Sequence, residues 1–403
     1  MALLVSETAP QARDWLGEIQ PTMRAVAQSG IVEVFNYGRG RQGLIPLWVG
    51  EGDLATPPFI AEAAKASLDR GETFYTHQRG IPELRDSIAR YMTRVYGAAP
   101  GVGDFSPERF FVTIGGMHAL DIATRLTVGP GEEALIPSPA WPNFAGALAL
   151  SGARAVFVPL ERGERWRLDP ERLASAVTPA TRAIFVNSPA NPTGFVGTHE
   201  ELEAVLTLAR RHGLWIIADE IYGRLTYQGG RTPSFHDVMA PGDKILFVQT
   251  LSKNWAMTGW RVGWLEAPPA LGPTIENLVQ FTTSGVPVFT QRGAVAALEK
   301  GEPFIADQIA RMREARDIVT RGLAATGRVH FATPEAAFYL FCAVDGEADS
   351  RALALRLVDE AGIGAAPGSA FGPGGEGYLR LCFARAPEEI AEATRRFARW
   401  LAR

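Results

Sequence analysis

The stretch Val248-Gln-Thr-Leu-Ser-Lys-Asn-Trp-Ala-Met-Thr-Gly-Trp-Arg-Val-Gly-Trp264 begins at the end of an apolar run that predicts a buried strand. It places Lys253 just beyond that strand, in aromatic and apolar surroundings. Burial and a neighbouring cation lower the pKa of a lysine toward the range in which its free amine attacks a carbonyl. The stretch therefore predicts a lysine that forms a Schiff base.

Three polar side chains accompany this lysine. The hydroxyls of Thr250 and Ser252 precede it and the guanidinium of Arg261 follows it, so together they would bind an anion beside the amine. Composition supports a special role, because only four of the forty basic residues are lysines, and the other three lie in polar settings. An isolated Ser-Lys pair would be an ordinary surface-loop lysine, but the context here favours the functional interpretation.

Around that stretch, residues 110–266 alternate between short apolar strands and segments of helix length. The predicted strands are 110–114, 134–136, 155–158, 183–186, 214–218, 245–248 and 261–265. Continuous apolar strands separated by helices indicate an α/β fold, with a mostly parallel sheet covered by helices on both faces. Asp169-Pro170 and the capping box Thr198-His-Glu-Glu201 mark two helix starts. Ligands bind at the carboxyl ends of such strands, so the residues just beyond them are candidates for a site.

The two ends of the chain have a different pattern. Long helices at 302–323, 350–361 and 387–402, with strands at 337–343 and 378–384, predict an α+β arrangement. The first 45 residues have no compact core of their own and must pack elsewhere. We therefore predict a large α/β domain at 46–290 that carries the site, and a small α+β domain formed by 1–45 and 291–403.

Composition excludes several classes of partner. The 403 residues carry a net charge of -4, which gives no polyanion-binding signature, so neither nucleic acid nor an acidic membrane surface is expected. No apolar run is long enough to span a bilayer, and the segment from Met1 to Val5 lacks a basic signal-peptide region. Cys342 and Cys382 are expected as buried thiols, which suits a reducing compartment. We expect a cytoplasmic protein without a metal site.

Two strand ends carry further polar groups. The strand at 110–114 leads into Gly115-Gly-Met-His-Ala-Leu120, where the free N–H groups and the dipole of a helix N-terminus would hold a phosphate. The strand at 214–218 is followed by Asp219 and then Tyr222. A carboxylate at the end of an apolar strand is costly unless paired, and a protonated ring nitrogen is a suitable partner. A plain glycine turn and a structural salt bridge at Asp219 are the alternatives.

An arginine lies in the middle of an apolar strand, within Gly377-Tyr-Leu-Arg-Leu-Cys-Phe-Ala384. Arg380 in such a place favours a planar anion, because a guanidinium binds a carboxylate through two parallel hydrogen bonds. An edge-strand arginine that faces water is the alternative. Near the N-terminus, the glycines of Gly50-Glu-Gly-Asp53 would let the backbone approach a ligand, although the spacing alone favours a plain turn.

Ser252-Lys253 with Met257-Thr-Gly-Trp-Arg-Val-Gly263 resembles the lysine motif of the class I/II aminotransferases, the pyridoxal-phosphate enzymes of fold type I. Asn187-Ser-Pro-Ala-Asn-Pro-Thr-Gly194 resembles their Asn-Pro-Thr-Gly signature, and the Asp-Glu-x-Tyr run at 219–222 resembles another of their motifs. The resemblance extends from Gly50 to Ala384. It implies an enzyme that moves an amino group from an L-amino acid to a 2-oxo acid, with pyridoxal 5'-phosphate as cofactor.

The resemblance also implies a role for each matching residue. The catalytic residues are Lys253, which holds the cofactor and moves a substrate proton, Asp219, which binds the ring nitrogen, and Tyr222, which binds the phenolic oxygen. The other cofactor contacts are Asn191 at the phenolic oxygen, Trp141 stacked on the ring, and Gly116, Met117, Thr250, Ser252 and Arg261 at the phosphate. The substrate-binding residues are Arg380, which grips the α-carboxylate, Asn191 and Gly50.

Family members complete their active sites across a dimer interface. Tyr75 matches the tyrosine that the neighbouring subunit sends to the phosphate, so a homodimer is implied. Met117 in the glycine loop, with no arginine candidate at 277–285, favours aromatic or aliphatic substrates, although Arg39 or Arg41 would suit an acidic one. A β-eliminating lyase of the same fold is the alternative activity. A non-catalytic cofactor-binding regulator would need an N-terminal DNA-binding module, and residues before Gly50 show no such pattern.

Overall fold

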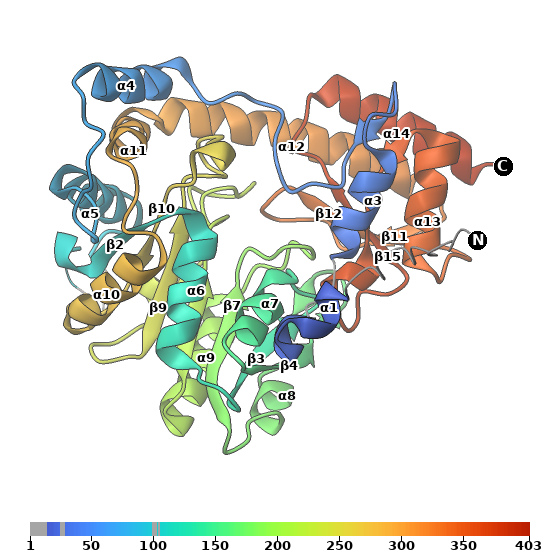
Figure 1. The fold of residues 1–403 in the computed structure, drawn as a ribbon. Coiled ribbons are helices and arrows are strands. Elements are labelled where there is room, and N and C mark those ends of the chain that lie inside the picture. Colours follow the sequence, from blue (N-terminus) through green and yellow to red (C-terminus); the bar gives the residue numbers. More distant parts are fainter. Residues whose placement is uncertain (1–13, 25–28, 99–102, 104) are drawn as a thin grey trace, which may run out of the picture.

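The computed structural model describes residues 14–24, 29–98, 103 and 105–403 (Figure 1). At its centre lies a seven-stranded sheet with the strand order β2-β10-β9-β8-β7-β3-β4. These strands are β2 (Phe110–Thr113), β3 (Glu133–Ser138), β4 (Arg154–Pro159), β7 (Thr181–Asn187), β8 (Trp215–Asp219), β9 (Ile245–Thr250) and β10 (Gly263–Glu266). All the strands predicted between residues 110 and 266 are therefore confirmed, and they belong to one sheet.

The sheet is parallel except at β10. Strands β4, β3, β7, β8 and β9 run in one direction, whereas β10 is antiparallel to both β9 and β2. The loop from β9 to β10 contains no crossover helix, which a parallel connection usually needs, so the chain turns back on itself. Lys253 and Arg261 lie in that loop, and the mostly parallel sheet is confirmed.

Helices cover both faces of the sheet. In β7, Ala183 and Phe185 pack into a core with α6 (Gly115–Thr127) and α7 (Asn143–Leu150). The alternate residues Ile184 and Val186 pack into a second core with α8 (Pro170–Ser175) and α9 (His199–His212). Burial on both faces explains why these strands are continuous apolar runs in the sequence.

The two predicted helix starts are present. Asp169 caps α8 by accepting hydrogen bonds from the N–H groups of Glu171 and Arg172. Thr198 and Glu201 form the reciprocal capping box of α9, and Gly213 ends that helix with a φ of 67°. Side-chain caps of this kind satisfy the backbone groups that a helix end leaves free, which fixes where each helix begins.

A third core covers the β2 edge of the sheet. It contains residues of β2 and β10 with α4 (Pro58–Asp69), α5 (Pro82–Tyr96) and α11 (Val288–Lys300). Helix α10 (Gly272–Thr282) packs against α6 and β2. The chain also contains the short helices α1 (Trp15–Glu18) and α2 (Pro21–Arg24), and the hairpin of β5 (Glu161–Arg162) and β6 (Trp166–Arg167).

The C-terminal part is built on a four-stranded antiparallel sheet. Its order is β11 (Val329–Phe331), β12 (Tyr339–Val344), β15 (Tyr378–Cys382) and β14 (Ala366–Pro367). Helices α12 (Glu302–Ala324) and α14 (Pro387–Leu401) pack on each other, and α13 (Ser350–Arg356) packs on α3 (Gly30–Gly38). Strand β1 (Ile45–Pro46) pairs with β13 (Ile363–Gly364), so the N-terminal segment joins this part (Figure 1).

The division of the chain at residues 45 and 290 stays a prediction, and residues 1–13 and 25–28 of the predicted small domain lie outside the described residues. Helix α12 runs from the neighbourhood of α11 to α14 and thus connects the two parts of the molecule (Figure 1). Among the described residues, none of the helices has the length and apolar character needed to cross a membrane.

Candidate active site

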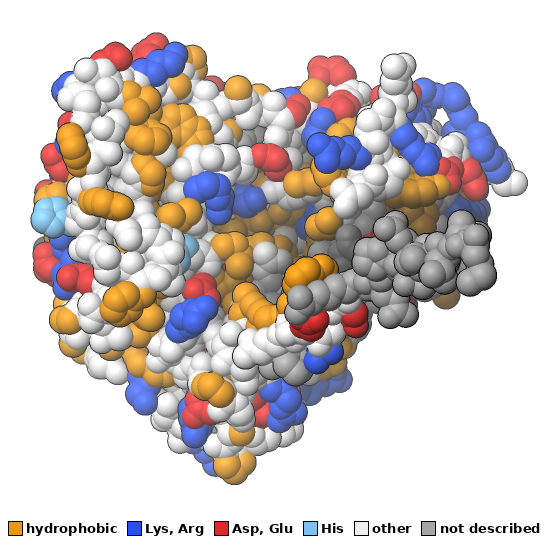
Figure 2. Space-filling view, viewed as in Figure 1, with side chains coloured by type: hydrophobic (Ala, Val, Ile, Leu, Met, Phe, Trp, Pro, Cys, Tyr) orange, Lys and Arg blue, Asp and Glu red, His pale blue; other side chains and the backbone are white. Residues whose placement is uncertain are grey.

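A cavity of about 360 Å³ lies where the carboxyl ends of β7, β8 and β9 face the C-terminal sheet. Figure 2 shows the hollow on this face of the molecule, with hydrophobic side chains on its walls. The predicted residues that line it are Gly50, Gly116, Met117, Trp141, Asn191, Asp219, Tyr222, Thr250, Ser252, Lys253, Arg261 and Arg380. These residues span most of the sequence, and the fold places them around one space.

Lys253 follows β9 and reaches back toward the N-terminal segment. Its Nζ donates a hydrogen bond to the carbonyl oxygen of Gly50 at 2.6 Å. Gln308 on α12 donates to the carbonyl oxygen of Lys253 at 3.1 Å and so holds the lysine backbone from the other side. Burial lowers the pKa of Lys253 to about 8. At neutral pH an appreciable fraction of this amine is therefore unprotonated and able to act as a nucleophile or base.

Asp219 ends β8 and is almost completely buried. Its Oδ1 accepts one hydrogen bond, from the N–H of Ile221 at 3.3 Å, and no ion pair joins it to any residue that the structure describes. Burial raises the pKa of Asp219 to about 7. A buried carboxylate without a cation is costly, so a cationic group in the cavity would stabilise its charged form.

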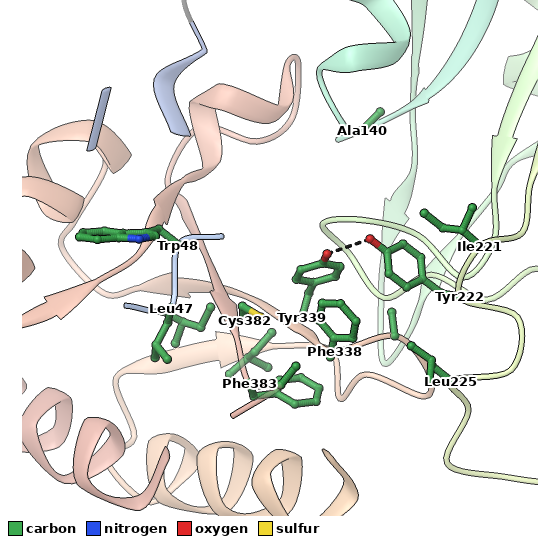
Figure 3. Close-up of a cluster of buried hydrophobic side chains, with 14 of the residues drawn as sticks. Leu47, Trp48, Ala140, Ile221, Tyr222, Leu225, Phe338, Tyr339, Cys382 and Phe383 are labelled. Atoms are coloured by element: carbon green, nitrogen blue, oxygen red, sulfur yellow. Dashed lines mark hydrogen bonds between the residues drawn. The ribbon is translucent and has the colours of Figure 1, made fainter. Parts of the chain in front are cut away.

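Tyr222 and Arg380 line the same cavity but come from different parts of the molecule. The hydroxyl of Tyr222 lies 2.8 Å from that of Tyr339, the first residue of β12 (Figure 3). Arg380 on β15 is 2% exposed and donates through Nη1 to Oδ1 of Asn191 at 2.9 Å, and through Nη2 to the carbonyl oxygen of Trp48. Its Nε–H has no partner among the described residues. A buried guanidinium with an unused donor is suited to bind a carboxylate.

An anion cradle lies at the opposite end of the cavity, at the N-terminus of α6. Gly115 has a φ of 70°, and a side chain there would overlap the guanidinium of Arg261. Thr250 donates to Ser252 at 2.9 Å, and both hydroxyls line the cavity beside the amides of Gly116 and Met117. Arg261 has a left-handed backbone with a φ of 51° and donates to the carbonyl oxygen of Thr258 at 2.7 Å. Helix N–H groups, hydroxyls and a guanidinium together provide the donors that a phosphate needs.

His118 lies in the first turn of α6 but points away from the cavity. Its Nε2 lies 2.9 Å from the hydroxyl of Thr282, and its Nδ1 accepts from the N–H of Ile114 at 3.3 Å. Burial lowers the pKa of His118. It is therefore a packing histidine and not a ligand of the cavity.

The structure adds several lining residues that the sequence analysis did not single out. The polar ones are Ser29, Asn143, Asn187, Thr258 and Tyr339. Asn187 accepts from the N–H of Asn191 at 2.8 Å. The apolar ones include Ile31, Val32, Val49, Leu120, Pro142 and Ile221. Tyr339 begins an apolar strand and has the appearance of an ordinary core residue in the sequence. Asn187 is the first residue of the octet Asn187–Gly194 and lies at the end of a predicted strand. That position could have identified it as a candidate site residue.

Tyr75 differs from the other predicted site residues. It does not line the cavity, and its side chain is 94% exposed. Phe74 and Phe281 are also strongly exposed, and Gln78 donates to Gln280 at 2.7 Å, which brings the two segments together. The single chain therefore does not bring Tyr75 to the site.

The donors in this cavity fit pyridoxal 5'-phosphate. The α6 cradle suits its phosphate, the unpaired carboxylate of Asp219 suits its ring nitrogen, and the amine of Lys253 suits its carbonyl carbon. A sequence model of the family described as "Aminotransferase class I and II" matches residues 42–397.

The chain belongs to the class I and II aminotransferase family.

This aminotransferase is 34% identical to aromatic-amino-acid aminotransferase 2 of Thermococcus litoralis, over 94% of its own length and 97% of that protein. It is also 34% identical to aspartate/prephenate aminotransferase of Thermus thermophilus, over 90% of its length and 93% of the relative. Among solved structures, Thermotoga maritima aspartate aminotransferase has a TM-score of 0.88 at 32% identity, covering 96% of this chain and 100% of that one. The Thermus thermophilus enzyme with maleate has a TM-score of 0.87 at 33% identity, covering 94% and 99%.

These similarities confirm the fold and the aminotransferase activity that the sequence motifs implied. Members of the family use pyridoxal phosphate and act on small molecules.

Proposed function

We propose that this aminotransferase binds pyridoxal 5'-phosphate in the cavity and uses it to move an amino group from an L-amino acid to a 2-oxo acid. One observation carries the proposal. Lys253, with its lowered pKa, and Asp219, a buried carboxylate that forms no ion pair with a described residue, line the same cavity. A protonated ring nitrogen supplies the charge that Asp219 lacks, and a carbonyl carbon suits the amine of Lys253.

Each lining residue then has a defined task. The hydroxyls of Thr250 and Ser252, the guanidinium of Arg261 and the amides of Gly116 and Met117 hold the phosphate. Trp141 covers the ring, Asp219 keeps the ring nitrogen protonated, and Tyr222 and Asn191 bind the phenolic oxygen. On the substrate, Arg380 pairs with the α-carboxylate, and Asn191 and Gly50 lie beside it.

Pyridoxal phosphate supplies an electron sink that stabilises negative charge at the substrate's Cα. Lys253 would hold the cofactor through its amine, and the same amine, when free, would be the base that removes the substrate's Cα proton. A pKa of about 8 suits that task, because the amine can both take up and release a proton near neutral pH. Arg380 orients the substrate so that its Cα proton faces Lys253.

We further propose that the amino donor has an apolar side chain. The cavity walls include Ile31, Val32, Met117 and Trp141, and the cationic residues in its described lining are Lys253, Arg261 and Arg380, each with a task above. None of them remains to neutralise a second carboxylate. The expected order of kcat/KM is therefore phenylalanine or leucine above aspartate, and a donor panel in which aspartate leads would refute this part of the proposal.

Exposed aromatic residues at Phe74, Tyr75 and Phe281 support a homodimer in which Tyr75 reaches the partner's phosphate cradle. Sedimentation analysis should give a dimer mass, and a monomer with full activity would exclude shared sites. We also propose a cytoplasmic location, which fractionation of cells that express the chain would test.

The experiment that tests the cofactor site is reductive trapping. Borohydride treatment of the cofactor-loaded protein should fix the cofactor covalently to one lysine, and peptide mass analysis should identify Lys253. The variant Lys253→Ala should show no trapped cofactor and should lose nearly all turnover. Lys244 is a matched control, because its Nζ donates to the carbonyl oxygen of Gly213 outside the cavity, and Lys244→Ala should trap as the wild type does.

The same preparation distinguishes transamination from β-elimination. A transaminase converts its bound cofactor stoichiometrically to the amino form and releases a 2-oxo acid. A lyase releases pyruvate and ammonia from a cysteine-type substrate without consuming a 2-oxo acid, and that outcome would replace the proposed reaction.

A further inference from the structure

We infer that Tyr339 is a positioning residue of this active site, which aligns the Tyr222 hydroxyl and supports the Arg380 guanidinium. This inference rests on the proposed function, in which Tyr222 binds the cofactor's phenolic oxygen and Arg380 binds the substrate carboxylate. Tyr339 is fully buried and lines the cavity. Figure 3 shows its hydroxyl directed at that of Tyr222, which comes from a different part of the molecule.

The direction of the hydrogen bond between the two phenols follows from a count of protons. Their oxygens lie 2.8 Å apart, and either one can donate when nothing else is bound. Each hydroxyl carries one proton. When Tyr222 donates its proton to the phenolic oxygen, it can only accept from its neighbour, so Tyr339 must donate to Tyr222. Tyr339 thereby directs the Tyr222 proton toward the cofactor. It also makes the Tyr222 hydroxyl a stronger donor, because hydrogen bonds in a chain polarise each other.

The backbone at Gly50 leaves space for the Tyr339 side chain. A side chain at Gly50 would overlap the Tyr339 hydroxyl, so glycine is required there for the phenol to reach Tyr222. The carbonyl oxygen of the same Gly50 accepts the hydrogen bond from Lys253. The loop that receives the lysine amine is therefore the loop that leaves room for Tyr339.

The ring of Tyr339 supports the substrate arginine. The guanidinium carbon of Arg380 lies 4.7 Å from the centre of the Tyr339 ring and 5.0 Å from that of Phe371, on strands and turns of the C-terminal part. Stacking on an aromatic face restrains a guanidinium and favours its charge. Hydroxyl and ring thus have separate tasks, one toward Tyr222 and one toward Arg380.

The titratable groups around the phenol pair are Asp219 on β8, Arg380 and Cys382 on β15, and Lys253 after β9. Substituting Tyr339 by phenylalanine leaves each of them in place. It removes one hydroxyl and keeps the ring that Arg380 stacks on. A change in the midpoint pH at which the bound cofactor titrates can therefore be attributed to the lost Tyr339 hydroxyl.

The test is a pH titration of the visible absorption band of the holoenzyme. Tyr339→Phe should move the midpoint upward by about 0.5 unit, which is the size expected for one weakened hydrogen bond. When Tyr222 is a weaker donor, the cofactor's phenolic oxygen keeps more negative charge. That charge attracts the proton whose loss changes the absorption band, so the proton is released only at a higher pH. The KM for the amino donor should change little, because the ring remains. Tyr339→Leu should show the same shift and also raise that KM roughly tenfold, since Arg380 loses the nearer of its two aromatic partners and keeps only Phe371.

Tyr227→Phe is the matched control. Tyr227 is also a buried tyrosine, and its hydroxyl donates to the carbonyl oxygen of Ala337 at 2.6 Å, outside the cavity. This variant loses a buried phenol bond of the same kind and should leave the midpoint at the wild-type value. Thermal unfolding of all variants checks that each is folded at the titration temperature.

Tyr222→Phe separates this inference from the proposed function. If Tyr222→Phe moves the midpoint and Tyr339→Phe does not, Tyr339 is only a core residue and the inference is wrong. If Tyr222→Phe leaves the midpoint unchanged, the proposed role of Tyr222 fails, and the inference fails with it. If both move it and the double variant matches Tyr222→Phe alone, Tyr339 acts through Tyr222 as inferred.

Discussion

Two buried carboxylates at strand ends of the central sheet have opposite surroundings. Glu266 ends β10 and is fully buried, but it lies 3.0 Å from Nε2 of His236 and accepts from Arg109 at 3.0 and 3.1 Å. Burial alone would raise the pKa of Glu266, and His236 and Arg109 outweigh it and hold that pKa below its usual value. Asp219 ends β8, is equally buried and has a single backbone donor, and its pKa is raised to about 7.

This difference in surroundings is the reason for giving Glu266 a structural role and proposing a catalytic one for Asp219. Glu266 has its partners within the chain and does not line the cavity, so folding alone completes its charge pair. Asp219 faces the cavity, and no described residue forms an ion pair with it. Perturbed carboxylates in a cavity mark functional sites more often than paired ones do. The same substitution at these two positions should therefore damage different properties of the enzyme.

Asp219→Asn should have the largest effect, and the effect should fall on catalysis. The amide fills the same space but cannot keep a ring nitrogen protonated, so kcat should fall roughly 10²–10⁴-fold, the range for loss of a positioned proton-holding group. Single-turnover absorbance with a saturating amino donor measures this directly. The folded state should survive, because the variant removes a buried charge that has no partner. A variant that turns over within threefold of the wild type would show that Asp219 is not the partner of the ring.

Glu266→Gln should instead reduce stability. It leaves the buried His236 and the mostly buried Arg109 without their carboxylate, and breaking a buried pair from one side costs about 3–5 kcal/mol. Urea unfolding of the holoenzyme should show the loss, while kcat of the folded fraction stays near the wild-type value. Glu392 is the comparison residue, because its pairs with Arg395 and Arg396 lie at the surface, and Glu392→Gln should unfold as the wild type does. Lost turnover without lost stability in Glu266→Gln would reverse the two assignments.

The residues beyond strand ends were predictable for a physical reason. Lys253, Asp219 and Asn191 each follow an apolar strand, and a parallel sheet brings such ends to one edge. Arg380 was visible as a cation inside an apolar strand. Tyr339 was not, because a tyrosine in an apolar strand has the pattern of a core residue and its hydroxyl partner is distant in sequence. The His236–Glu266 pair was missed because its two residues are 30 positions apart in the sequence. The role proposed for Tyr75 would require a second chain.

In the cofactor-free protein, Asp219 and Glu266 should make opposite contributions to the pH dependence of the free energy of unfolding. Between pH 4 and 7 the unfolded chain has lost the Asp219 proton and the folded chain keeps it, because the folded pKa is raised to about 7. The folded state then binds more protons, so its stability falls as the pH rises through this window, by an amount on the order of 4 kcal/mol. Glu266 has a lowered folded pKa, so its contribution is present above pH 4.5 and is lost as the pH falls below that value.

Urea unfolding across the pH range measures both slopes. Asp219→Asn should remove the decline between pH 4 and 7 and leave the loss at lower pH unchanged, and Glu266→Gln should do the reverse. Adding pyridoxal phosphate to the wild type should also remove the decline, because the ring cation lets Asp219 ionise in the folded state. A decline that persists in Asp219→Asn would mean that another buried group titrates there. Glu220 would then be the first to examine, because it is buried next to Asp219 and burial raises its pKa as well.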